Sequence, residues 1–238
     1  SCSYICHILQ GKVIDDLELR KHGLEIHPID PVRFQPLPGG NRLLGWYDDA
    51  RSEDEIRRIS PRDADRFRDW TAFWKRASGM LHRYWLTDAP TLAELADDVR
   101  GTADEVVLER MLTGNVKDLV EEYFESPIVR AAFIDAQDAG DPRAPGSIMA
   151  VAYIKSNTFT ARENLGIPSG GMGSITQAMA HAAEARGVEI RTGVEVDHIN
   201  VSNGKATGVA LKNGEELNAD IVLSNADPKR TFLTLVED

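Results

Sequence analysis

The sequence predicts an α+β protein made of two dissimilar parts. Residues 60 to about 138 carry apolar and aromatic side chains at steps of three and four residues, the spacing of amphipathic helices. After residue 194 the chain instead contains three strand-like runs joined by two Asn-Gly pairs, a pattern typical of tight hairpins. Near the N-terminus, the Pro- and Gly-rich stretch DPVRFQPLPGG excludes a helix and indicates a small β element.

The composition and charge of the chain disfavour several classes of protein. Of its 238 residues, 42% are hydrophobic and 27% charged, which is typical of a globular protein with one large domain or two smaller ones. A net charge of −11 disfavours binding to nucleic acid and to anionic lipid. The sequence leaves open a local basic patch at Arg57, Arg58, Arg62, Arg66 and Arg68.

Neither a membrane span nor a secretion signal is visible. No run approaches ~18 consecutive apolar residues, and no basic segment precedes an apolar one at the N-terminus. Cys2 and Cys6 lack the second pair that a zinc site or a disulfide framework needs, so we expect buried thiols in a reducing compartment. The histidines show no metal-ligand spacing. We therefore expect a soluble, cytoplasmic protein without a metal site.

The first part of the chain is expected to alternate between helix and short strands. Apolar spacing predicts a helix over residues 7 to 22, closed by Gly23. The runs LEIHPID and NRLLGWYD read as strands on either side of the proline-rich stretch. The acidic run DDARSEDE that follows is interpreted as a solvated face.

The predicted helical region carries several start signals. Ser60-Pro61 and Ser126-Pro127 place a capping residue before a proline, and the pairs Thr91 with Glu94 and Thr102 with Glu105 have capping-box spacing. PRAPGSIMAVAYIKS predicts one more helix. The aromatic stripe of Trp70, Trp74 and Trp85 fits a helical core face, and it could also form the wall of an apolar pocket.

Beyond Gly166 the pattern changes again. A helix is predicted after GGMG, with Gly187 at its end, followed by a short strand VEI. A three-stranded meander is then predicted from the runs VEVDHINV, ATGVALK and ELNADIVLS. The Asn-Gly pairs at 203-204 and 213-214 between these runs supply the positive φ angles of tight hairpins. Asp227-Pro228 is expected to cap a last helix.

The glycine loop at residues 170 to 173 is the most conspicuous motif. A dinucleotide fingerprint needs a buried parallel strand feeding into G-x-G-x-x-G, whereas this chain has G-x-G-x-x-T after a segment that contains Pro168. Arg191 stands where an acid would bind the ribose of NAD, which leaves a NADP site as a weaker alternative. Ser174 does not lie in the G-x-S-x-G motif of hydrolases. A glycine-rich helix start can still meet an anion or a flat ring.

Longer motifs carry a resemblance to a known family. PSGGMGSITQAMAHAAEARGVEIRTGVEVDHINV and KNGEELNADIVLSNADPKRTFLTL resemble the phytoene desaturase group of FAD-dependent oxidoreductases. A closer resemblance, to its branch of pyridine nucleotide-disulphide oxidoreductase domain-containing protein 2, is carried by the segments SCSYICHILQGKVIDDLELRKHGLEIHPIDP, PRDADRF and DPRAPGSIMA. The resemblance covers most of the chain, and it implies a two-domain flavoprotein of the amine oxidase type in the α/β flavoprotein superfamily.

The resemblance also implies a domain organisation. Residues 1 to 19 would lead out of the FAD domain, residues 20 to 160 would form the substrate-binding domain, and residues 161 to 238 would form part of the FAD-binding domain. The family's N-terminal glycine fingerprint does not precede SCSY, so we expect a fragment that binds FAD weakly or not at all. Exposed surface at the missing unit would favour self-association.

By the same resemblance, several residues are assigned to a site. The cofactor-binding candidates are Gly171, Met172, Val196, Ser224, Asn225 and Ala226, and the substrate-pocket candidates are Gly170, Trp70 and Trp74. The expected reaction is hydride transfer from an apolar small-molecule substrate to FAD, with no side chain standing out as a catalytic base. A non-catalytic binding or scaffold protein derived from such an enzyme is the alternative.

Overall fold

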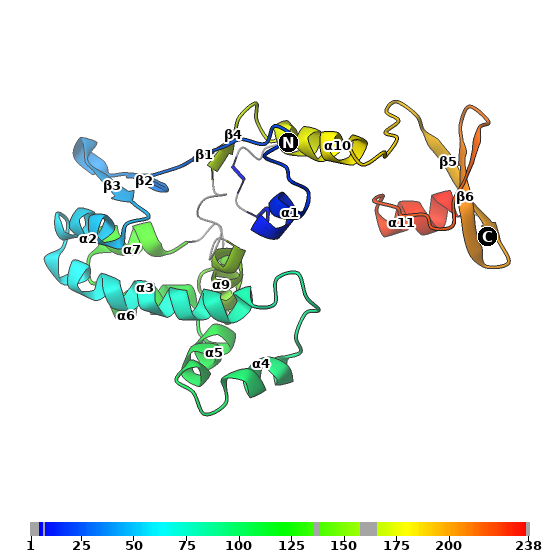
Figure 1. The fold of residues 1–238 in the computed structure, drawn as a ribbon. Coiled ribbons are helices and arrows are strands. Elements are labelled where there is room, and N and C mark those ends of the chain that lie inside the picture. The colour runs from blue at the N-terminus through cyan, green and yellow to red at the C-terminus, as the bar shows by residue number, and fades with distance from the viewer. Residues whose placement is uncertain (1–4, 7, 136–138, 158–165, 237–238) are drawn as a thin grey trace. The chain divides into compact units, whose positions relative to one another are not determined.

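The computed structural model describes residues 5, 6, 8–135, 139–157 and 166–236, and it divides into two compact units. One unit spans Ser1–Ala182 and the other Ala183–Asp238. The predicted organisation drew its boundary between residues 160 and 161, and it remains a prediction. The described residues combine helices with three small antiparallel sheets, which agrees with an α+β protein (Figure 1).

The first unit is mostly helical. Its helices are α1 (Gly11–Asp16), α2 (Asp49–Arg57), α3 (Pro61–His82), α4 (Leu92–Val99), α5 (Asp104–Thr113), α6 (Val116–Tyr123), α7 (Pro127–Phe133), α9 (Ser147–Asn157) and α10 (Gly173–Glu184), which continues into the second unit. Its strands are β1 (Ile26–Pro28), β2 (Arg33–Pro36), β3 (Arg42–Gly45) and β4 (Gly166–Pro168), and a 3-10 turn η1 (Pro38–Gly40) joins β2 to β3. β2 pairs with β3, whereas β1 pairs with the distant β4.

Helix α3 is the centre of the larger hydrophobic core. Phe67, Trp70, Phe73 and Trp74 on this helix are buried, and the ring of Trp70 packs 5.1 Å from that of Phe124. Helices α5, α6 and α9 pack around α3 (Figure 1). The predicted aromatic stripe is therefore confirmed as a core-facing helix surface up to His82, where α3 ends.

Asp63 is buried in this core and joins two helices. Its side chain is 1% exposed and lies in the first turn of α3. Its carboxylate oxygens accept hydrogen bonds from the backbone N–H groups of Glu125, at 2.7 Å, and Ser126, at 3.0 Å. These groups precede α7, so the carboxylate satisfies donors that the start of that helix leaves unpaired.

A second ionic link ties the β2–β3 hairpin to the helices. The Asp135 carboxylate lies 2.6 Å from Arg33 Nη2 and 3.1 Å from Lys155 Nζ. Burial acts to raise the pKa of Asp135, but the two cations outweigh burial and hold that pKa below its usual value. Asp135 is therefore expected to stay ionised in the folded protein.

Helix starts were predicted with mixed success. Ser60 caps α3, and Thr91 and Glu94 form a complete capping box at α4, as expected. The box predicted at Thr102 and Glu105 is wrong, because α5 begins at Asp104 and its N-cap makes no side-chain hydrogen bond. The hydroxyl of Thr102 instead donates to the carbonyl of Val99 at 2.6 Å and accepts the Asp104 N–H at 3.1 Å.

Three other expectations in the first unit are met fully or in part. The predicted helix over residues 7 to 22 is shorter, since α1 ends at Asp16 and turns continue to Gly23, which has a φ of 98°. Cys6 is buried, as expected, in a bridge to Gly166, and burial raises the pKa of its thiol; Cys2 and His7 lie outside the described residues. The run DDARSEDE lies largely in α2 and is mostly exposed, as expected of a solvated face, but Ser52 and Glu55 are buried.

The second unit is built on the predicted meander. Its strands are β5 (Val196–Ser202), β6 (Lys205–Leu211) and β7 (Glu216–Asn218), followed by α11 (Pro228–Arg230) and a π-helical turn η3 (Thr231–Leu235). Asn203 and Gly204 both have positive φ, as a tight hairpin requires. At the second Asn-Gly pair positive φ is recorded at Gly214 alone, and the loop has three residues, Lys212 to Gly214, closed by the Leu211 N–H bond to Glu215.

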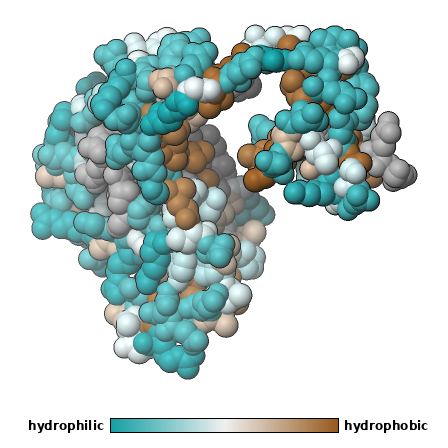
Figure 2. Space-filling model, turned by 45° about the vertical axis from the view of Figure 1, so that its right-hand side comes forward, coloured by the Kyte–Doolittle hydropathy of each residue, from teal (hydrophilic) through white to brown (hydrophobic). Residues whose placement is uncertain are grey.

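The second unit exposes apolar side chains on its surface. Leu223 is 93% exposed, Ile221 76%, Leu233 74% and Phe232 68%. Figure 2 shows hydrophobic side chains reaching the surface of this unit. The predicted strand VEI is wrong, because Val188 to Ile190 lie outside every helix and sheet among the described residues. ADIVLS continues beyond β7 outside any assigned strand, and within it the Ala219 N–H donates to the carbonyl of Thr207 on β6 at 2.9 Å.

Candidate functional site

The glycine turn links strand β4 to helix α10. Gly170 and Gly171 have φ angles of 79° and 83°, which side-chain-bearing residues rarely adopt. The Gly171 N–H donates to the carbonyl of Pro168 at 2.9 Å, and Ser174 closes the first turn of α10 by donating to the carbonyl of Gly171 at 3.0 Å. The turn is therefore fixed by its own backbone.

The strand before this turn differs from that of a dinucleotide fingerprint. β4 has three residues and pairs antiparallel with β1, with Ile26 opposite Pro168. A fingerprint glycine turn instead follows a buried parallel strand. The structure thus agrees with the sequence-based argument that GGMG is a different kind of helix start.

Packing explains the glycine at position 166 but not the glycine at position 173. A Cβ at Gly166 would lie 2.1 Å from the carbonyl oxygen of His27, so the β1–β4 pairing requires glycine there. A Cβ at Gly173 would meet nothing within 4 Å, and Gly173 is not among the glycines with positive φ. Neither backbone strain nor a neighbour in the described structure accounts for glycine at this position, which leaves the start of α10 open.

Met172 lies between this open turn and a small core. Its side chain is partly buried and packs against the cluster formed by Cys6, Ile14, Leu19, Leu24, Ile26, Ile175, Ala178 and Ala182. Gly171, beside it, would place a Cβ in open space. The turn can therefore admit a flat group close to its backbone, with Met172 on the protein side.

The second unit holds the other predicted cofactor residues. The Ser224 and Thr231 hydroxyl oxygens lie 2.8 Å apart, and Ser224 Oγ also accepts the N–H of Ala226 at 3.3 Å. Asn225, between them, is exposed. Val196 is half-buried at the start of β5, where it pairs with Leu211. These bonds hold residues 224 to 226 as a turn that leaves the Asn225 amide free to meet another group.

A cavity of about 340 Å³ lies beside this turn within the second unit. Ser224, Ala226 and Thr231 contribute its polar edge. The remaining lining is mainly apolar and comprises Ile199, Val201, Ala206, Val222, Pro228, Phe232 and Val236. The structure thus brings Ser224 and Ala226 together at one cavity of the second unit, whereas Gly170, Gly171 and Met172 belong to the first unit.

The two tryptophans predicted to line a substrate pocket lie in the core. Trp70 is 3% exposed and Trp74 5%. Their rings pack edge to face at 5.5 Å, and the Lys155 ammonium lies 5.3 Å from the centre of the Trp74 ring. Their assignment to a substrate pocket remains a prediction, and their burial favours a supporting position behind any such pocket.

An open aromatic pocket lies further along the same region. Trp85 and Tyr153 stack with ring centres 5.3 Å apart, and the Trp85 indole N–H donates to Ser156 Oγ at 2.8 Å. They line a cavity of about 300 Å³ with Leu81, Tyr84, Leu86, Thr87, Ala89 and Pro90. Sequence reasoning named Trp85 as part of the stripe but missed Tyr153, because nothing in the spacing links α9 to the end of α3.

Arg191, the side chain on which the alternative NADP site depends, is paired with two carboxylates. Arg191 Nε lies 2.7 Å from Glu189 and Nη1 2.8 Å from Glu215. Its hydrogen bonds to Glu189, which has the larger effect, and to Glu215 raise the pKa of its guanidinium. The five arginines considered as a basic patch are also paired with carboxylates, Arg57 and Arg68 with Glu53 among them.

The described residues contain neither a cluster of metal ligands nor a helix that could span a membrane. Among the described residues, no three His, Cys, Asp or Glu side chains gather in a way that would hold a metal ion. In the same part of the chain, every helix is too short or too polar to cross a membrane.

The fold and the glycine turn are those of an α+β protein without a dinucleotide fingerprint at GGMG, and comparison with known proteins gives the family. The family model for flavin containing amine oxidoreductase matches residues 18–230. The chain belongs to this family of oxidoreductases, whose cofactor is FAD.

Several curated proteins are similar over most of the chain. Pyridine nucleotide-disulfide oxidoreductase domain-containing protein 2 of Mus musculus is 31% identical, over 98% of this chain and 45% of its own length. The neurosporene-forming phytoene desaturase of Rhodobacter capsulatus is 29% identical, over 89% of this chain and 39% of its own length. Hydroxyneurosporene desaturase of Rubrivivax gelatinosus is 29% identical, over 86% of this chain. The chain thus spans less than half the length of these relatives.

Proposed function

We propose that this chain is the substrate-binding part and a portion of the flavin-binding part of an FAD-dependent oxidoreductase of the desaturase or dehydrogenase type. The observation that carries the proposal is the family match across residues 18–230. In such an enzyme, FAD accepts a hydride from an apolar substrate. The protein's own residues then orient the donor carbon and exclude water.

The glycine turn is the proposed point of approach to the flavin ring. Gly170 and Gly171 let the backbone turn before α10, and Gly173 adds no side chain where none is required by packing. A planar ring could therefore approach the peptide groups of this turn more closely than side chains would allow. Met172 would support the ring from the direction of the core.

In the second unit, a backbone contact and a turn are proposed to hold the rest of the cofactor. The backbone at Val196 would meet the adenine end of FAD, and Ser224, Asn225 and Ala226 would follow the cofactor as a preformed turn. Support for this comes from the hydrogen bonds of Ser224 with Thr231 and Ala226, which fix the turn without using the Asn225 amide. The FAD-binding assignment of residues 161 to 238 rests on the same resemblance.

The substrate is proposed to bind to residues 20 to 160. The aromatic pocket at Trp85 and Tyr153 offers an apolar, partly exposed wall, whereas Trp70 and Trp74 would stiffen the region from the core. An apolar small molecule matches this lining because its transfer from water to an apolar wall is favourable.

The test compares two glycines in the complete protein. Gly171 and Gly101 both have positive φ, at 83° and 72°, and a Cβ at either one would meet nothing within 4 Å. Gly171→Ala and Gly101→Ala therefore carry a similar backbone cost, but only the first adds a methyl group to the proposed flavin approach. We expect Gly171→Ala to lower bound FAD, measured by flavin absorbance after purification, and Gly101→Ala to retain it.

Two results would count against this function. Equal flavin content in the two variants would remove Gly171 from the cofactor site. A complete protein that folds but stays colourless would favour the alternative, a binding or scaffold protein without catalysis. The isolated chain is expected to bind FAD weakly or not at all, and to be inactive.

A further inference from the structure

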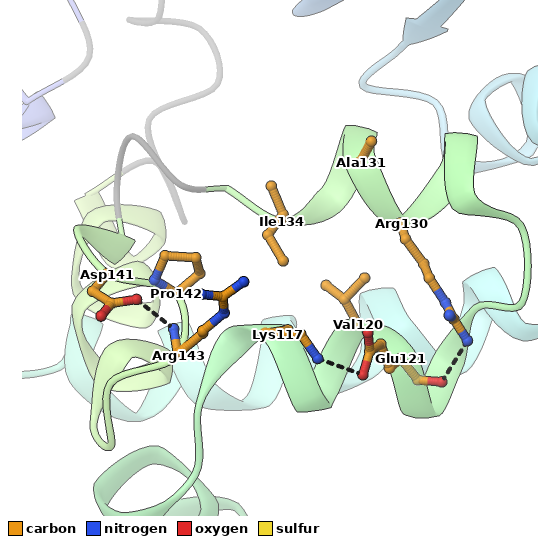
Figure 3. Close-up of a pocket in the computed structure, with 9 residues that line it drawn as sticks. All are labelled: Lys117, Val120, Glu121, Arg130, Ala131, Ile134, Asp141, Pro142 and Arg143. Atoms are coloured by element: carbon orange, nitrogen blue, oxygen red, sulfur yellow. Dashed lines mark hydrogen bonds and ion pairs between the residues drawn. The ribbon is translucent and has the colours of Figure 1, made fainter.

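A cavity in the helical region is lined by three cationic and two acidic side chains, so its described lining carries a net positive charge. It has a volume of about 400 Å³ and lies among α6, α7 and the loop before α9 (Figure 3). Its lining includes Lys117, Arg130 and Arg143 together with apolar side chains such as Val120 and Ile134. The volume falls in the range of about 300–1,000 Å³ that is typical of small-molecule sites.

Arg143 supplies the free cation of this cavity. Among the described residues, its guanidinium has no hydrogen-bond or ion-pair partner; the nearby carboxylate of Asp141 accepts the backbone N–H of Arg143 instead, at 2.9 Å. Figure 3 shows the Arg143 side chain reaching toward Ile134 and Lys117. Most other arginines of the helical region contact a carboxylate, for example Arg76 with Asp104 at 2.6 Å. In a chain with a net charge of −11, such a group is unusual.

Arg130 adds a second cation held in place by backbone. Its Nε donates to the carbonyl of Phe124 at 2.6 Å, and its Nη2 lies 3.4 Å from the carbonyl of Glu121. These bonds cover the end of α6 and leave the charge without a carboxylate partner in the described structure. Lys117 differs, because its Nζ is paired with the Glu121 carboxylate at 2.8 Å.

The cavity wall is built rather than accidental. The N–H of Lys117 donates to the carbonyl of Pro142 at 2.9 Å, and Ser147 Oγ accepts the N–H of Val116 at 3.0 Å, so the loop that carries Arg143 is tied to the start of α6. Val120 is fully buried, and Ile134 is half-buried on the opposite side of the cavity. An apolar surface and the Arg143 side chain thus line the same cavity, and the backbone of the loop that carries Arg143 is held in place.

We propose that this cavity binds a small organic carboxylate, with the carboxylate on Arg143 and the apolar body against Ile134 and Ala131, in front of the buried Val120. The planar guanidinium matches a carboxylate in a two-pronged hydrogen bond. A monoanion suits the site better than a phosphate dianion, because the Asp141 and Glu121 carboxylates lie on the same rim. This ligand site is separate from the flavin and substrate sites proposed above, and it does not depend on them.

The test uses four probes on the full chain, measured by isothermal titration calorimetry. Octanoate carries both charge and apolar body, 1-octanol lacks the charge, octylamine reverses it, and inorganic phosphate lacks the apolar body. We expect octanoate to bind and each of the other three to bind at least about tenfold more weakly. Added salt should weaken octanoate binding, because an exposed ion pair is screened.

Variants locate the binding to this cavity. Arg143→Gln should lower octanoate affinity at least about tenfold, and Arg143→Lys should lower it less because the charge remains. Arg42→Gln is the matched control, since Arg42 is also an exposed arginine with no carboxylate partner recorded in the described structure, but lies on β3. The proposal is overturned if octanoate does not bind, if 1-octanol binds equally well, or if Arg143→Gln binds octanoate like the unchanged chain.

Discussion

Replacing Asp63 should weaken the helical unit more than its position near a helix start suggests. The carboxylate is buried and accepts two backbone N–H groups that precede α7, at 2.7 and 3.0 Å. A hydrogen bond to a charged group contributes about 1.5–3 kcal/mol, although water could reach Glu125 and Ser126 and recover part of this. We therefore expect Asp63→Ala to lower the free energy of unfolding by about 2–4 kcal/mol.

The assay can be confined to the helical unit. All four tryptophans, Trp46, Trp70, Trp74 and Trp85, belong to the first unit, so urea unfolding followed by tryptophan fluorescence reports on that unit. The shift of the urea midpoint, multiplied by the slope of the transition, gives the change in stability. Asp63→Asn keeps one acceptor oxygen and should give an intermediate loss.

Asp65 provides the matched control. It lies two residues further along α3, is exposed, and pairs with Arg57 at 2.9 Å. Exposed pairs of this kind contribute about 0–1 kcal/mol, so Asp65→Ala should leave the midpoint nearly unchanged. If Asp63→Ala and Asp65→Ala shift the midpoint equally, the buried carboxylate does not hold α7 and the reasoning fails.

Three further predictions concern charge, packing and surface. The pKa of Asp135 is lower in the folded than in the unfolded chain, so its ionised carboxylate stabilises the fold above the unfolded pKa of about 3.9, and this effect is lost as pH falls through the lower folded pKa. The difference in unfolding free energy between the native chain and Asp135→Asn, measured by urea titration, should therefore shrink below about pH 4. A difference that does not change with pH would contradict this. A Cβ at Gly208 would lie 2.1 Å from the carbonyl oxygen of Leu217, whereas a Cβ at Gly204 would meet nothing within 4 Å. Gly208→Ala should therefore speed amide hydrogen exchange in β5–β7 more than Gly204→Ala does. Equal exchange rates in the two variants would show that the pairing of β6 with β7 adjusts to the added methyl group. Leu223→Ser combined with Phe232→Ser should lower any self-association seen by sedimentation velocity, and Leu92→Ser, a control at an exposed leucine in α4, should not.

Local signals in the sequence predicted elements well where the determinant is itself local. Ser60, Thr91 and Asp227 each cap a helix as expected, because a side-chain oxygen and the backbone donor it satisfies lie within three residues. The hairpin at Asn203 and Gly204 is similarly self-contained. The box at Thr102 failed because α5 begins at Asp104 with Ala103 as its N-cap, so the Thr102 hydroxyl accepts the N–H of Asp104 rather than that of Glu105.

Features that depend on distant residues were beyond sequence reasoning. The pairing of β1 with β4 joins Ile26 to Pro168 across most of the first unit, and no spacing rule reaches that far. The strand expected at Val188 to Ile190 needs a neighbouring strand, and alternation of apolar residues cannot say whether one is present. The residues of the charged cavity come from three separate segments, so neither Arg130 nor Arg143 stood out in the sequence.

The irregular run from residue 188 to 194 has a practical consequence. It contains Gly193 and the exposed Val188, Ile190 and Val194, and it lies outside the described helices and sheets. Exposed irregular segments are preferred sites of proteolytic nicking. A single cut here would yield one piece carrying every tryptophan and tyrosine of the chain and another, holding the meander, that is almost invisible at 280 nm. Fragments from limited digestion should therefore be followed by mass rather than by absorbance.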